Sequence, residues 1–217
     1  MRRAALKSIL LLTSLCMAGW TQSAPKDIRG VDFKNFSYPW VPPTSWPDHL
    51  QWMSLRLEPH IQLVGGKWDE RKADDDDETN APFEGLTLEG VDYARLSSDQ
   101  VDDAIVVLRH DSGGTQYHYW VYIYGGANGT AKLLGFFHSG DRAAYGLYRV
   151  FVKNRILTVQ LFDPKFGEGD CCSSGSLTYG FRWNGKGFEA IGNPIPGPVE
   201  TESRRAVSIF GLPIEQH

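Results

Sequence analysis

The chain has 217 residues, of which 26 are acidic and 22 basic, so its net charge at pH 7 is −4. This length suits one domain with a core of its own. An acidic chain without a cluster of Lys and Arg excludes nucleic acid and anionic membrane surfaces as expected partners. No apolar run beyond the first 23 residues is long enough to cross a bilayer, so we predict no transmembrane segment.

Residues 1–23 have the order of a secretory signal. Basic residues (Arg2, Arg3 and Lys7) precede a short apolar run at 9–18, and small residues follow at 21–23. We favour a Sec signal over a twin-arginine signal. Cys16 follows Leu15 instead of a small residue, which disfavours a lipoprotein. Cleavage would leave about 194 residues with 19 basic and 26 acidic side chains, a net charge of −7, in the periplasm or outside the cell.

Residues 24–50 are rich in proline and aromatic side chains, which predicts an extended arm. So many aromatic rings are not left in water, and we expect the arm to lie over the domain. Residues 52–64 are predicted strand material, and residues 65–82 a polar, charged loop. The acidic run at 74–78 lacks the alternating spacing and the glycine of a calcium loop, so we interpret it as solvated and predict no metal or other cofactor.

From residue 86 onward the pattern is β. Predicted strands cover 104–108, 115–124, 132–138, 146–153, 156–162 and 177–183, with one helical turn best placed at 97–103. Apolar and polar residues alternate in the last strand, and Asn154-Arg155 and Asn184-Gly185 read as tight hairpin turns. We predict an all-β fold, an antiparallel meander that forms a sandwich or open barrel. A single β domain would span 51–193, followed by a proline-containing tail at 194–217 with a candidate strand at 206–210.

Cys171 and Cys172 are the two thiols that remain after removal of the signal. In an oxidising compartment we favour a vicinal disulfide between them, a strained ring that would shape the loop locally. Two free thiols, a metal site and a bridge between two chains are the alternatives. Zinc sites use a second ligand pair that is missing here. A bridge between chains would give a disulfide-linked dimer.

One block of the sequence extends from Val91-Asp92-Tyr93-Ala94 through Phe162-Asp163-Pro164 and Asp170-Cys171-Cys172-Ser173 to Tyr179-Gly180-Phe181-Arg182-Trp183. It resembles bacterial exported proteins of unknown function related to the LppP/LprE-type lipoproteins, over roughly residues 84–190. The resemblance implies an exported protein and no enzyme activity. Ser173 stands where that family often has proline, and the lipobox is missing.

Residues 93–105 also resemble the strand, loop and strand of integrin-like calcium repeats. The aspartates of such a loop are interrupted here and its glycine is missing, so we expect an ordinary connection without an ion.

Several side chains invite a functional interpretation. His110-Asp111-Ser112 is not a catalytic triad, because adjacent side chains of an extended segment point to opposite faces. His118 and His138 are expected to be core or edge histidines. The strand at 115–124 carries aromatic residues on both faces, so it is either central and covered or presents a binding surface. The ligand-binding candidates are Tyr119, Trp120, Tyr122, Asp141 and Arg142.

The sequence thus predicts a non-enzymatic binding or structural module whose partner is an unidentified envelope component or protein. An envelope enzyme, either a hydrolase or a thiol oxidoreductase that uses the Cys171-Cys172 loop, is the alternative. Redox enzymes usually combine Cys-x-x-Cys with a helix N-terminus, and no helix is predicted after Cys172.

Overall fold

The computed structural model describes residues 27–40, 50, 52, 60–70, 84–98, 100–111, 117–127, 130–141, 143–167, 173–199 and 209–210. Within these ranges the chain is almost entirely β and its sheets are antiparallel, which confirms the predicted fold class. Two short 3₁₀ turns, η1 (Ile28–Gly30) and η2 (Phe33–Asn35), interrupt the strands. The helical turn predicted at 97–103 is wrong, since its described residues up to 102 are irregular and Asp103 begins a strand. The predicted signal and the acidic run at 74–78 lie outside the described residues.

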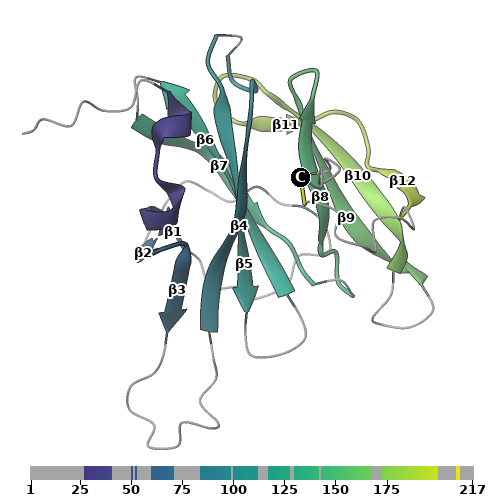
Figure 1. The fold of residues 1–217 in the computed structure, drawn as a ribbon. Coiled ribbons are helices and arrows are strands. Elements are labelled where there is room, and N and C mark those ends of the chain that lie inside the picture. The colour runs from purple at the N-terminus through teal and green to yellow at the C-terminus, as the bar shows by residue number, and fades with distance from the viewer. Residues whose placement is uncertain are drawn as a thin grey trace, which may run out of the picture.

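The first sheet is a meander of five strands in sequence order (Figure 1). They are β3 (Lys67–Glu70), β4 (Glu84–Ala94), β5 (Asp103–Asp111), β6 (Tyr117–Ala127) and β7 (Thr130–His138). We predicted a loop over residues 65–82, and this prediction is wrong for residues 67–70. They form β3, which pairs with the start of β4. Trp68 explains why, because its ring packs against the core and holds this charged segment on the sheet.

The second sheet continues the chain as β8 (Leu147–Lys153), β9 (Ile156–Gly167), β10 (Ser173–Trp183) and β11 (Phe188–Ala190), and β12 (Ile195–Pro198) also pairs with β10. Asn154 and Arg155 join β8 to β9 with φ values of 53° and 61°, the left-handed pair that a two-residue hairpin needs. The hairpin at Asn184-Gly185 is likewise present, with Gly185 at φ 94°. β12 has one pairing partner among the described strands, a position where proline is tolerated.

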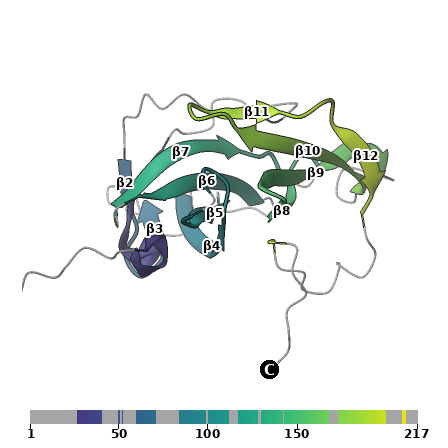
Figure 2. The same ribbon diagram turned by 90° about the horizontal axis from the view of Figure 1, so that it is seen from above.

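The two sheets face each other across one apolar core, and Figure 2 shows them as two layers. The first sheet contributes Val107, Val121 and Phe137, and the second contributes Val159 and Phe181. The alternation predicted for residues 177–183 is explained by this core, because Tyr179, Phe181 and Trp183 all pack against it while Arg182 is exposed.

The opposite face of the first sheet is covered by the N-terminal arm, which includes β1 (Ser37–Pro39), and β1 pairs with β2 (His60–Gln62). Tyr38 and Trp40 are buried there against the rings of Tyr122 and Trp120, and Phe33 is buried against the ring of Tyr124. The described part of the arm thus lies over the domain, as predicted. Strand β6 is buried on both of its faces. None of the described residues belongs to a helix long and apolar enough to cross a membrane.

Residues 209–210, the described part of the C-terminal segment beyond residue 199, contact both sheets. The backbone N–H of Val150 in β8 donates to the carbonyl oxygen of Ile209 at 2.8 Å. The ring of Phe210 lies against Gly90 in β4, so close that a Cβ at that position would be 2.7 Å from Cε2 of Phe210. Residues 206–208 of the strand predicted at 206–210 lie outside the described residues.

Candidate functional site

A polar and aromatic group lies at the end of the sandwich where β5 finishes and β6 begins. We call it the Arg109 site, and it consists of Glu89, Arg109, Tyr117 and Tyr119. Arg109 and Tyr119 are directly paired across β5 and β6, so both side chains lie on the same face of the first sheet. This is the face that meets the second sheet, since Tyr119 packs at the margin of the core between the sheets. Tyr117 starts β6 two residues earlier, on the same face.

A β-bulge brings Glu89 into this site. The pairing of β4 with β5 shifts between Leu88 and Gly90, which makes Glu89 an extra residue in β4. A bulge changes the direction of a side chain and bends the strand. Here the Glu89 carboxylate reaches the guanidinium of Arg109, with Oε1 2.9 Å from Nη1.

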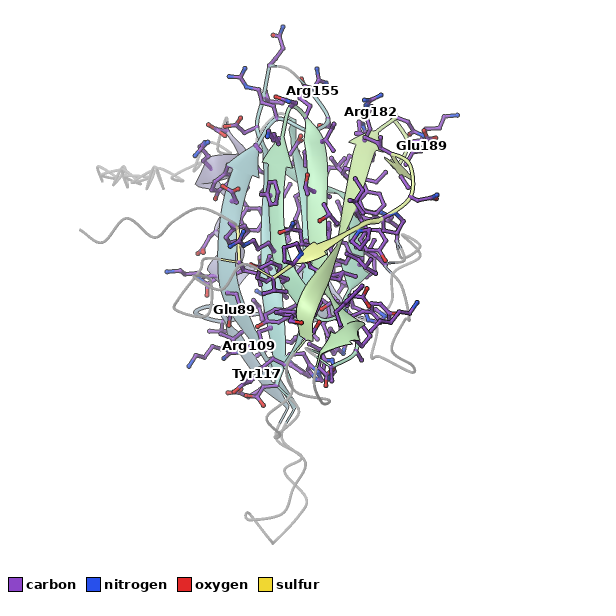
Figure 3. The ribbon with its side chains drawn as sticks, turned by 90° about the vertical axis from the view of Figure 1, so that its right-hand side faces the viewer. Glu89, Arg109, Tyr117, Arg155, Arg182 and Glu189 are labelled. Atoms are coloured by element: carbon purple, nitrogen blue, oxygen red, sulfur yellow. The ribbon has the colours of Figure 1, made fainter. Side chains whose placement is uncertain are left out.

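The guanidinium of Arg109 is held between an acid and a ring. It lies over the ring of Tyr117, 4.8 Å from the ring centroid. The side chains of Arg109 and Glu89 are 32% and 28% exposed, and Tyr117 is 42% exposed. Nε of Arg109 is buried and has no hydrogen-bond partner within the described part of the chain. Figure 3 shows Glu89, Arg109 and Tyr117 together at one end of the molecule, with Arg155, Arg182 and Glu189 at the other.

Burial raises the pKa of Tyr119, and the negative charge of Glu89 raises it further, although Arg109 acts in the opposite direction. The phenol therefore stays protonated at neutral pH and can donate a hydrogen bond. The site combines a cation, an anion, a protonated phenol and an accessible ring. This combination suits the binding of a polar ligand.

A second cluster lies on the other face of the same strand ends. We call it the histidine cluster: His110, His118 and His138 with Trp40 and Trp120. His110 is paired with His118 and Trp120 with His138, and the rings of Trp120 and His138 stack at 5.3 Å. Trp40 from the arm covers the cluster, 4.5 Å from Trp120 and 5.4 Å from His110 between ring centroids. His118 is buried and His138 is half-buried, as expected for core or edge histidines, and His110 is buried as well.

Burial in the histidine cluster favours the uncharged imidazoles of His118 and His138. Burial lowers the pKa of His118 to about 4, and His110 and His138 lower it further, while Asp141 and a hydrogen bond with the backbone of Gly140 oppose the shift. Burial also lowers the pKa of His138. His110 contacts Trp40 of the arm directly, and His138 stacks on Trp120, which in turn packs against Trp40.

The binding candidates named from the sequence fall into different environments. Tyr119 belongs to the Arg109 site. Trp120 and Tyr122 are fully buried under the arm, and the Tyr122 hydroxyl donates to the carbonyl oxygen of Pro39. Asp141 is buried and accepts a hydrogen bond from the backbone N–H of Ala143, so it shapes the turn between β7 and β8. Arg142 lies outside the described residues.

Cys171 and Cys172 also lie outside the described residues, but the strand ends on either side of their loop are described. Gly167 at the end of β9 pairs with Ser173 at the start of β10. The buried Ser173 hydroxyl lies 2.5 Å from the carbonyl oxygen of Asp163 and 2.9 Å from that of Phe166. Strand β9 continues through Asp163 and Pro164, so it is longer than the segment predicted at 156–162.

The segment that resembles a calcium repeat is held by protein groups. The Asp103 carboxylate accepts hydrogen bonds from the backbone N–H groups of Leu96 and Ser97 and from the Ser97 hydroxyl. Asp102 forms an ion pair with Arg29 at 2.8 Å. Among the residues that the structure describes, no group of three or more His, Cys, Asp or Glu side chains could hold a metal ion.

Glu89, Arg109 and Tyr117 were not predicted from the sequence. Glu89 and Arg109 are 20 positions apart, and nothing in their local pattern connects them. The one available signal is Gly90, because a glycine inside a strand often marks a bulge.

Comparisons with protein-family models, curated proteins and solved structures find no match to this chain.

Proposed function

We propose that this chain is an exported, non-enzymatic binding module of the periplasm or the extracellular space, and that it takes its ligand at the Arg109 site. The observation that carries the proposal is the stacking of the Arg109 guanidinium on the partly exposed ring of Tyr117, beside Glu89. The buried aromatic rings of β6 are occupied in packing the arm, whereas Tyr117 remains accessible to a ligand.

The construction of the site supports binding. Arg109 and Tyr117 belong to regular strands, and Glu89 is held by a bulge between paired residues. Side chains on paired strands are held more rigidly than side chains on loops, which lowers the entropy lost when a ligand binds. Tyrosine and arginine are also the side chains that most often provide binding energy at interfaces.

The export part of the proposal rests on two features. Basic residues precede an apolar run within residues 1–23, and residues 84–190 resemble bacterial exported proteins. Fractionation of cells that express the full chain tests it. We expect the protein in the periplasm or the medium with a new N-terminus near residue 24. A full-length chain in the cytoplasm would contradict the proposal.

The cysteine part of the proposal is a disulfide between Cys171 and Cys172. Mass spectrometry of the exported protein without reductant should show a monomer two hydrogens lighter than the dithiol form. Twice the monomer mass would support a bridge between two chains, and the dithiol mass would contradict both disulfide proposals.

The binding site itself is tested by photo-crosslinking in living cells. A photoreactive phenylalanine at Tyr117, which keeps an aromatic ring beside Arg109, should capture an envelope component, and Arg109→Lys should abolish capture because lysine cannot reproduce the planar fork. The matched control places the same photoreactive residue at Arg182, at the far end of β10 (Figure 3). Equal capture at both positions, or capture that ignores Arg109→Lys, would overturn the proposed function.

A further inference from the structure

The charge balance of the Arg109 site indicates the class of ligand. The positive charge of Arg109 already has a partner, since the Glu89 carboxylate lies 2.9 Å from Nη1. An anionic ligand would have to separate this pair and would face the negative charge of Glu89. A cationic ligand would face Arg109 in the same way. The pair therefore favours a ligand without charge.

The same pair presents a hydrogen-bond acceptor and a donor side by side. Glu89 can only accept, and Arg109 can only donate. Two hydroxyl groups on adjacent carbons complement this arrangement, because one can donate to the carboxylate while its neighbour accepts from the guanidinium. Sugars carry such hydroxyl pairs, whereas a peptide backbone offers its donor and acceptor in fixed alternation. Hydrogen bonds to charged groups are among the stronger ones in proteins.

Tyr117 supplies the apolar part of the site. The guanidinium covers the ring from one side, and 42% of the residue remains exposed. A tyrosine combines an apolar ring face with a polar edge, and a sugar ring does the same with its C–H face and its hydroxyl groups. Arg109 also limits the movement of the Tyr117 ring, so little freedom is lost when a second ring stacks on it.

From these features we infer that the Arg109 site binds an uncharged glycan, through neighbouring hydroxyl groups of one sugar on Glu89 and Arg109 and the C–H face of that sugar on Tyr117. The inference rests on the proposed function and specifies its ligand.

Titration calorimetry of the mature protein with maltotetraose, mannotetraose and tetragalacturonate tests the inference. We expect at least one neutral tetrasaccharide to bind more tightly than tetragalacturonate, and its permethylated form, which cannot donate hydrogen bonds, not to bind. Arg109→Lys and Tyr117→Ala should each weaken binding at least about tenfold, and Glu89→Gln should weaken it by a smaller factor because an amide still accepts.

Arg182→Lys and Glu189→Gln are the matched controls. These two residues are paired across β10 and β11 at the other end of the sandwich, and both are exposed. They should leave glycan binding unchanged. Thermal unfolding of every variant, compared with the wild-type chain, separates loss of binding from loss of the fold.

Two results would overturn the inference. One is tighter binding of tetragalacturonate that improves with Glu89→Gln, which would make this an anion site. The other is no response to any neutral glycan while crosslinking at Tyr117 still captures an Arg109-dependent partner. In both cases the proposed binding function would stand and its ligand class would change, whereas loss of Arg109-dependent capture would remove the proposed function itself.

Discussion

The hydroxyl of Tyr122, in the middle of β6, donates a hydrogen bond of 2.8 Å to the carbonyl oxygen of Pro39 in the N-terminal arm. The two residues are 83 positions apart, and both are buried. Tyr38 lies beside them, with its ring centroid 5.2 Å from that of Tyr122. This bond joins the arm to the centre of the first sheet, and it makes the arm part of the folded domain.

Replacement of Tyr122 by Phe tests the contribution of this bond. The change keeps the ring and leaves the buried Pro39 carbonyl without its donor, so we expect a loss of about 1–2 kcal/mol in the free energy of unfolding. Urea denaturation monitored by fluorescence measures the loss. Tyr117→Phe at the exposed start of β6 is the control and should change stability by less than about 0.5 kcal/mol. Equal effects of the two changes would show that the bond to Pro39 contributes nothing.

The loop after β4 offers a comparison of two neighbouring acids. Asp103 is buried and accepts three hydrogen bonds from Leu96 and Ser97, whereas Asp102 forms an ion pair with the exposed Arg29. Asp103→Ala should cost roughly 3 kcal/mol, because it leaves several donors without partners. Asp102→Ala should cost at most about 1 kcal/mol, as expected for an exposed ion pair. Chemical denaturation measures the loss in the free energy of unfolding for both variants. A larger loss for Asp102→Ala than for Asp103→Ala would contradict this account.

The histidine cluster makes stability depend on pH. Because the pKa of folded His118 lies at about 4, below its unfolded value of about 6.5, the unfolded chain binds more protons between these values. The contribution of neutral His118 to the free energy of unfolding is therefore complete above about pH 6.5. It declines as the pH falls toward 4, by up to about 3 kcal/mol. Asp141 opposes this effect, and His110 and His138 enhance it.

Denaturation curves between pH 4 and pH 7 measure this dependence. We expect His118→Gln to flatten it and His60→Gln, at an exposed position in β2, to leave it unchanged. Proteolysis of the arm at each pH adds a second readout, since Trp40 packs on the cluster and should be released first. A wild-type stability that does not fall toward pH 4 would show that the histidines are not held neutral.

The turn between β7 and β8 leaves no room for a side chain at Gly140. A Cβ there would lie 1.6 Å from the carbonyl oxygen of Ala144, while a Cβ at Gly187 would meet nothing within 4 Å. We expect Gly140→Ala to destabilise the protein by about 3 kcal/mol or to prevent its accumulation, and Gly187→Ala to be nearly neutral. Yield of folded protein and thermal unfolding by circular dichroism measure both. A stable, fully folded Gly140→Ala variant would contradict the geometry of this turn.

Most strands could be predicted because their signals are local. Alternation at 177–183 follows from one buried and one exposed face, and Asn154-Arg155 has the conformation that joins adjacent strands. β3 was missed because its charged residues carry no strand pattern, and Trp68 holds it to the sheet through a contact with the core. The helical turn at 97–103 was wrong because Asp103, at the end of that segment, begins β5 and accepts hydrogen bonds from the backbone N–H groups of Leu96 and Ser97.

The sequence alone determined the fold class and the main strands, because alternation, turn residues and hydrophobicity act over a few neighbouring positions. It left open whether the aromatic rings of β6 are covered or exposed, and the structure shows those of Trp120 and Tyr122 covered by the arm. The tertiary structure decided which residues meet. It placed Trp40 over Trp120, and it brought Glu89 to Arg109 through a bulge in β4. These contacts depend on the register of strands far apart in the chain, and the free energy that selects a register comes from the packing of the whole sheet.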